Sequence, residues 1–320
     1  MFNRLKTAGA LCLALCATAL PAQDYPSKPI RMIVPNAPSG LADISARIVA
    51  VKLAEALGQP VVVDNRAGAG GTIGTAVAVK APADGYTLLT VFDSHATNPH
   101  LFNHLDYDGL RDLAPVSLLV RGPLLLAAHP KSGFRSTQEL LRAAKSRPGE
   151  IKFASVGPGS PARLLMELLK VEARIDVANI PYKGAGAAVT DLIGGQVDAI
   201  FATIPTLLPH VRDGRLLALA VTSPKRNAAV PGVPTMNETI PGFVAESWVG
   251  MLAPAQTPRE IIARLNAETI KILAQPEIRA RFAELGYETG GGTPAQLDQW
   301  IRNETARWGK LIRAQKITLE

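Results

Sequence analysis

The chain has 320 residues, of which 47% are hydrophobic and 19% are charged, and its formal net charge is +7. This composition is typical of a globular protein and excludes a disordered chain. Basic residues are scattered and few aromatic residues stand among them, so no nucleic-acid-binding surface is expected. A mildly positive protein instead favours anionic ligands.

Residues 1–22 have the pattern of a secretory signal peptide. Arg4 and Lys6 precede an apolar run at residues 8–20, and small residues follow. This run is shorter than the roughly 20 residues that a membrane-spanning helix needs, so we expect cleavage on export rather than a permanent anchor. Both cysteines of the chain lie in this segment, and the mature protein would contain none.

Short apolar runs alternate with helical patterns along the mature chain. The runs are bounded by Gly, Pro or Asp, as buried strands are. They cover residues 30–34, 61–63, 86–92, 124–128, 151–156, 177–182, 197–203 and 216–221. Strands that alternate with helices predict an α/β fold with largely parallel sheets.

Three expected helix starts carry a hydroxyl residue followed three residues later by Glu or Gln. Ser136, Thr257 and Thr293 each stand in this capping-box pattern. We therefore expect each hydroxyl to accept a hydrogen bond from the backbone at the start of its helix.

The length of the chain favours two α/β units rather than one. Two apolar stretches, at 115–128 and 216–222, have no helix-length gap and are suited to carry the chain between the units. The expected division is a first lobe of residues 23–122 and 223–320 and a second lobe of residues 123–222. A ligand cleft that closes by a hinge would then lie between the lobes.

At residues 34–43 an apolar strand ends in a Pro/Gly loop and a helix begins. Free backbone N–H groups at the start of a helix attract anions. The candidates for contact with a small anionic ligand are Asn36, Pro38, Ser39, Gly40, Leu41 and Ala42. Asp43 is assigned to helix capping or loop bracing, because its carboxylate would repel such a ligand.

A second junction of this kind follows the expected strand at 151–156. Its candidate ligand contacts are Gly157, Gly159, Ser160 and Pro161. Ser160 is suited to cap the next helix, with Pro161 at the first helical position, which leaves the amides around Gly159 for a ligand. A well-capped helix without a ligand role is the alternative.

The glycine cluster at 68–74 does not match a nucleotide-binding site. A dinucleotide fingerprint reads G-x-G-x-x-G, and the sixth residue counted from Gly68 is Ile73. The chain also has no Walker lysine, no G-x-S-x-G elbow and no H-E-x-x-H motif. No acidic cluster accompanies His95, His100 and His104, so neither a metal site nor another cofactor is expected.

Many short segments resemble, in content and order, the Bug family, the extracytoplasmic solute receptors of tripartite tricarboxylate transporters. These segments are 25–30 (YPSKPI), 57–66 (LGQPVVVDNR), 68–74 (GAGGTIG), 83–89 (ADGYTLL), 98–101 (NPHL), 114–117 (APVS), 181–184 (PYKG), 192–198 (LIGGQVD), 217–223 (LALAVTS), Trp248 and 252–258 (LAPAQTP). The resemblance implies a type II periplasmic-binding-protein fold, in which two crossover strands join two α/β lobes around a ligand cleft. It also implies capture of a small organic acid in the periplasm, without bond chemistry, and delivery to a membrane transporter with one large and one small subunit.

Family position adds further candidate contacts. Ser94 and His95 follow the expected strand at 86–92 and are suited to donate to a carboxylate, although His95 has a turn-bracing role as its alternative. Tyr182 ends another strand, where it either lines the cleft or packs. Ala202 and Thr203 stand where relatives often carry Asp or Asn, which disfavours a ligand with a distal amine.

The first loop departs from the family pattern. Relatives usually have Pro-Gly-Gly where this chain has Pro38, Ser39 and Gly40, many carry an aromatic residue in place of Asn36, and Leu41 is larger than usual. These changes leave the backbone donors in place and alter the pocket wall. We expect a monomeric receptor; a sensory module with a signalling partner and an exported enzyme acting on a carboxylate are the alternatives.

Overall fold

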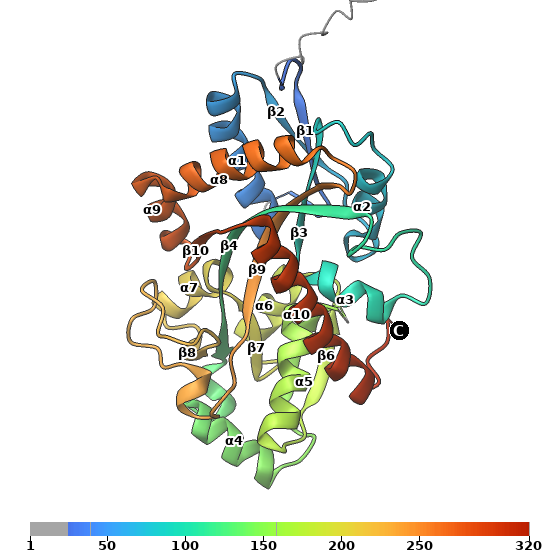
Figure 1. The fold of residues 1–320 in the computed structure, drawn as a ribbon. Helices are drawn as coiled ribbons and strands as arrows, with labels where there is room; N and C mark the ends of the chain where they lie inside the picture. Colours follow the sequence, from blue (N-terminus) through green and yellow to red (C-terminus); the bar gives the residue numbers. More distant parts are fainter. Residues whose placement is uncertain (1–24, 39, 158, 320) are drawn as a thin grey trace, which may run out of the picture.

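The computed structural model describes residues 25–38, 40–157 and 159–319 (Figure 1). The expected signal peptide and Ser39 therefore lie outside the described residues. Within these ranges no helix combines the length and the apolar character that crossing a membrane requires.

The first of two sheets is built from both ends of the chain. Its order is β2 (Val61–Asn65), β1 (Ile30–Val34), β3 (Thr87–Phe92), β9 (Glu246–Pro254) and β4 (Leu113–Ala128), and β10 (Glu288–Gly291) also pairs with β4. Strands β1, β2 and β3 are parallel, whereas β9 runs antiparallel to β3 and β4. The helices that pack on it are α1 (Leu41–Leu57), α2 (Thr72–Val79), α8 (Arg259–Ala274) and α9 (Pro276–Glu284).

The second sheet is built from the middle of the chain. Its order is β4, β7 (Ala199–Thr203), β5 (Lys152–Val156) and β6 (Ala178–Tyr182), and β8 (Leu217–Val221) also pairs with β4. Strands β5, β6 and β7 are parallel. Its helices are α4 (Thr137–Ser146), α5 (Pro161–Ala173), α6 (Ala185–Ile193) and α7 (Ile204–Arg212).

The chain passes between the sheets in β4 and in β9. Strand β4 pairs with β9 up to Pro123 and with β7 from Leu124 onward, so one strand belongs to both sheets. The stretch at 115–128 is most of this strand, as expected. The stretch at 216–222 instead contains β8 of the second sheet, and the return is made by β9, which the sequence pattern did not reveal.

Residues 223–245 pack mainly against the second sheet. Met236, Ile240 and Phe243 belong to the same buried cluster as Phe153 of β5 and Phe201 of β7. The division of the chain at residues 122 and 222 remains a prediction.

Helix α10 (Pro294–Ala314) connects the cores of the two sheets. Leu297 and Ile301 near its start pack in a buried cluster with Trp248, whereas Trp308 and Ile312 near its end pack with the second core. Figure 1 shows α10 running diagonally past α3 (Asp93–Leu101) toward α5. The two lobes are therefore linked by this helix as well as by the crossover strands.

Two of the three expected helix caps are confirmed. Ser136 Oγ accepts from Glu139 N at 3.2 Å, and Thr293 forms a complete capping box with Gln296. The expected cap at Thr257 is wrong, because Pro258 takes the N-cap position of α8. The Thr257 hydroxyl is buried and has no hydrogen-bond partner within the described part of the chain.

Candidate functional site

A cavity of about 560 Å³ lies between the two sheets, and we call it the interlobe cavity. From the first lobe it is lined by the loops after β1 and β2 and by α3, and from the second by the loops after β5 and β6. Its lining includes Asn36, Ala37, Gly68, Gly70, Gly71, Phe92, Ser94, Asn98, Leu101, Phe102, Val156, Gly157, Gly159, Ser160, Pro161 and Lys183. Parallel strands leave such a crevice at their carboxyl ends.

The first loop contributes Asn36 and Ala37 to the cavity wall. Pro38, Gly40, Leu41 and Ala42 are not part of this lining, and Ser39 is outside the described residues. Gly40 is the extended N-cap of α1 and makes no side-chain cap bond.

Asp43 lies behind the first loop and is only 3% exposed. Asn65 Nδ2 donates to its Oδ1 at 2.9 Å and to the carbonyl of Asn36 at 3.1 Å, and Arg47 forms an ion pair with it at 2.9 Å. These contacts connect β2, the loop and α1, so the carboxylate braces the loop.

The glycine segment after β2 forms a wall of the cavity, a role that the sequence analysis missed. Gly68, Gly70 and Gly71 all have positive φ, and a side chain at Gly70 would stand 3.2 Å from Asn98 Oδ1. Asn98 Nδ2 in turn donates to the carbonyl of Gly70 at 3.0 Å. The missed signal is topological: β2 and β1 are parallel neighbours, so their loops open at the same edge.

Ser94 and His95 directly follow β3, as expected, and occupy the first turn of α3. Ser94 lines the cavity, is 9% exposed, and its hydroxyl has no hydrogen-bond partner among the described residues. Successive helical residues are rotated by about 100°, so His95 points elsewhere and packs against Gly109. Burial lowers the pKa of His95 to about 4, so its imidazole is neutral at neutral pH.

The loop after β5 starts α5 with a side-chain cap. Ser160 Oγ accepts from Arg163 N at 3.2 Å and donates to the carbonyl of Gly157 at 2.9 Å, and Pro161 is the first helical residue. A side chain at Gly159 would stand 2.6 Å from Leu101 Cδ1, so the loop closely approaches α3 of the other lobe. The α5 N-terminus thus faces the same cavity as Ser94.

Tyr182, Ala202 and Thr203 are not part of the cavity lining. Tyr182 donates to Asp191 Oδ2 at 2.8 Å, and partial burial together with this bond raises the pKa of Tyr182 to about 12. Ala202 and Thr203 pair with β4 at the end of β7. That end is covered by the turn at Gly286, where a side chain would stand 2.7 Å from Ile204 Cδ1.

Asp93 connects the cavity to a crossover strand. Ser247 Oγ of β9 donates to Asp93 Oδ2 at 2.5 Å, and the backbone of Trp248 adds a further bond. Burial raises the pKa of Asp93 to about 7, while the Ser247 bond acts in the opposite direction and nearby Glu304 raises it further. The residue next to Ser94 therefore titrates near neutral pH.

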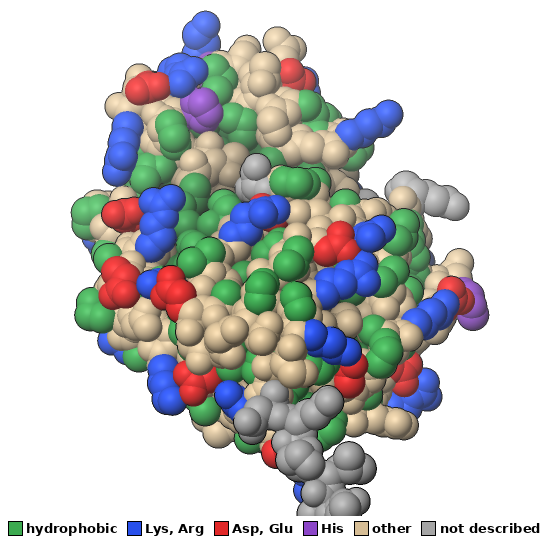
Figure 2. Space-filling model, turned by 90° about the horizontal axis from the view of Figure 1, so that it is seen from above, with side chains coloured by type: hydrophobic (Ala, Val, Ile, Leu, Met, Phe, Trp, Pro, Cys, Tyr) green, Lys and Arg blue, Asp and Glu red, His purple; other side chains and the backbone are tan. Residues whose placement is uncertain are grey.

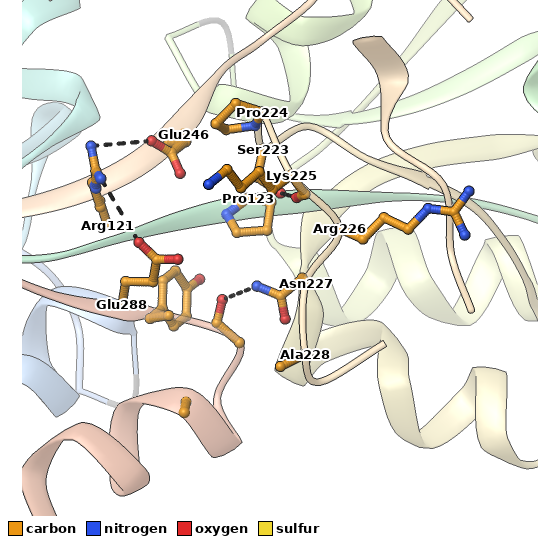
Figure 3. Close-up of a pocket in the computed structure, with 13 residues that line it drawn as sticks. Arg121, Pro123, Ser223, Pro224, Lys225, Arg226, Asn227, Ala228, Glu246 and Glu288 are labelled. Carbon is orange, nitrogen blue, oxygen red and sulfur yellow. Dashed lines mark hydrogen bonds and ion pairs between the residues drawn. The ribbon is translucent and has the colours of Figure 1, made fainter. Parts of the chain in front are cut away.

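A second cavity, of about 310 Å³, lies at the crossover strands (Figure 3). Arg121 stands 3.8 Å from both Glu246 and Glu288, and Asn227 Nδ2 donates to the carbonyl of Gly286 at 2.9 Å. The wall also contains Lys225 and Arg226, and Arg226 is paired with Glu238 at 2.7 Å. The two carboxylates of this wall oppose an anionic ligand, whereas the described lining of the interlobe cavity contains no Asp or Glu. The interlobe cavity is the better anion site.

The surface and the histidines give no sign of a different ligand class. On the face drawn in Figure 2, Lys and Arg side chains are interspersed with Asp and Glu. In the described ranges, no three His, Cys, Asp or Glu residues are grouped so that they could hold a metal ion.

Two α/β sheets that share a crossover strand, with a cavity between the ends of their parallel strands, define a two-lobed solute-binding protein. The sequence model of the "Tripartite tricarboxylate transporter family receptor" matches residues 45–317. The chain belongs to this family of periplasmic receptors, and the predicted family and type II periplasmic-binding-protein fold are confirmed.

Relatives and solved structures agree with this assignment. Protein BugT of Bordetella pertussis is 42% identical over 316 residues, covering 97% of each chain. The structure titled "R. palustris Rpa4515 with adipate" superposes with a TM-score of 0.84 at 33% identity, covering 92% of this chain and 100% of that one. MatC (Rpa3494) from Rhodopseudomonas palustris with bound malate gives a TM-score of 0.78 at 32% identity, covering 90% and 100%.

Proposed function

We propose that this protein captures a small carboxylate in the interlobe cavity and delivers it to a membrane transporter of the tripartite tricarboxylate type. One observation carries the proposal. The N-terminus of α5, with its Ser160 cap, and the unpartnered hydroxyl of Ser94 face the same cavity from opposite lobes. Helix N-termini and hydroxyl groups are donors suited to a carboxylate.

The composition of the cavity wall supports an anionic ligand. Its described lining contains no Asp or Glu, so no side-chain carboxylate there opposes a bound anion. Two of the solved structures that the chain resembles carry adipate and malate, which are both organic acids. A carboxylate bridging the loops of both lobes would favour the closed form and shift the population toward it.

We also propose how the chain is exported and how its two lobes are composed. Residues 1–22 direct export to the periplasm and are then removed, and the lobes comprise residues 23–122 with 223–320 and residues 123–222. The mature protein acts as a monomer. Its mechanism is binding and closure, without bond chemistry.

A thermal-shift screen tests the binding proposal. Organic acids that bind should raise the melting temperature, since a ligand at 100 times its Kd stabilises the folded state by about 2.7 kcal/mol. Their uncharged amides should not raise it, because they lack the carboxylate that the cavity binds. Ser94→Ala should reduce the shift, and Ser146→Ala, at the exposed end of α4, is the matched control. Stabilisation by the amides alone would contradict the proposal.

Product analysis separates binding from catalysis. After prolonged incubation with the best ligand, the ligand should be recovered unchanged. Conversion of the ligand to another compound would instead identify an enzyme.

A further inference from the structure

Lys183 carries the only charged side chain among the described residues that line the interlobe cavity. The rest of that lining consists of backbone, neutral polar groups such as Ser94 and Asn98, and apolar side chains. Lys183 has no ion-pair partner within the described ranges, whereas nearby Arg163 is held by Glu167 at 2.8 Å. The cavity wall therefore carries one cation that is exposed to solvent and has no ion-pair partner among the described residues.

The register of the second sheet places Lys183 beside the N-terminus of α5. Val156 at the end of β5 lies opposite Tyr182 of β6, so Lys183 stands next to Gly157. Neighbouring strands are about 5 Å apart. Lys183 lies in the bend that follows β6 and lines the cavity together with Gly157, whereas Tyr182 is turned toward Asp191.

These positions separate two kinds of anion contact. The amides at the start of α5 and the hydroxyl of Ser94 satisfy one carboxylate, as in the proposed function. Lys183 then remains for a second anionic group on the same ligand. Leu101, Phe102 and Val156 also line the cavity and offer an apolar wall suited to a short carbon chain.

We propose, on the basis of the proposed function, that Lys183 is a specificity-determining residue that selects dicarboxylates over monocarboxylates of the same length. The second carboxylate forms a charge-assisted contact with the Lys183 ammonium. When a monocarboxylate is bound, the Lys183 ammonium stays hydrated and adds nothing to the affinity.

Calorimetric titration with matched acids tests this inference. The probes are adipate with hexanoate and succinate with butyrate, each pair having the same number of carbons. Wild-type protein should bind the dicarboxylate of at least one pair more tightly than its monocarboxylate. Lys183→Gln should lower the affinity for that dicarboxylate about tenfold and leave the affinity for the monocarboxylate unchanged. Lys183→Arg, which keeps the positive charge, should bind the dicarboxylate nearly as tightly as wild type.

Lys225→Gln is the matched control, because it removes the same charge from the cavity at the crossover strands. It should change neither affinity. The inference would be overturned if Lys183→Gln lowered the affinity for both acids equally or changed neither affinity. Either result would leave carboxylate capture intact. Failure of the wild-type protein to bind any of the four acids would instead count against the proposed function and the inference together.

Discussion

Replacing Asp93 by Asn should change how the stability of the protein depends on pH. Asp93 is 6% exposed, accepts a 2.5 Å hydrogen bond from Ser247 and lies near the carboxylate of Glu304. Burial raises its pKa from 3.8 to about 7. Ionised Asp93 is therefore a cost to the folded state, and the neutral amide of Asn removes that cost.

The magnitude follows from the difference in pKa. A raised pKa means that the folded state binds more protons than the unfolded state between about pH 4 and pH 7, so stability falls as the pH rises through this window. A shift of about 3 units at about 1.4 kcal/mol per unit gives roughly 4 kcal/mol in total. About 2.5 kcal/mol of this should be lost between pH 5 and pH 8.

Urea denaturation at pH 5, 6, 7 and 8 measures the effect. The free energy of unfolding of Asp93→Asn relative to wild type should rise across this range by about 2.5 kcal/mol. Taking the difference cancels the contribution of His95, whose lowered pKa reduces stability as the pH falls below about 6.5. Asp213→Asn, at an exposed position, should show no such rise. A constant difference from pH 5 to pH 8 would show that the pKa of Asp93 is not raised in the folded state.

Three smaller predictions concern caps, protonation and the glycine wall. Thr293→Ala should cost about 1 kcal/mol in urea denaturation, whereas Thr257→Val should be neutral or stabilising, because only the first hydroxyl caps a helix; equal losses would contradict this. Nitrogen NMR should find the His95 ring neutral at pH 6, since its pKa is about 4, and a charged ring at that pH would show that it is not buried. Gly70→Ala and Gly133→Ala both replace a glycine of positive φ and should destabilise similarly, but only Gly70→Ala should weaken acid binding.

The sequence predicted most of the strands because each is a short apolar run ended by a turn residue. Strand β10, with the sequence ETGG, carries no such signal, and only its pairing with β4 makes it a strand. Strand β9 contains Gly250 and ends at Pro254, and its place between β3 and β4 depends on pairs distant in the sequence. A local sequence pattern does not predict which distant segments pair in a sheet.

The candidate site was predicted at the level of loops and less well at the level of side chains. Ser160 and Gly159 could be identified because strand, cap and proline occur in sequence order. Lys183 directly follows Tyr182 and lies in the bend after β6, where neither strand nor helix periodicity predicts the direction of a side chain. His95 lies outside the cavity lining because α3 begins at Asp93 and the face of this helix decides which side chain meets the cavity.

A crystal structure of the protein with adipate tests carboxylate capture between the lobes. We expect a carboxylate in the interlobe cavity, with an oxygen within about 3.2 Å of the backbone N–H of Gly159, Ser160 or Ala162 and of the Ser94 hydroxyl. Adipate bound instead in the cavity at the crossover strands, or bound between the lobes without contact to these donors, would contradict this expectation.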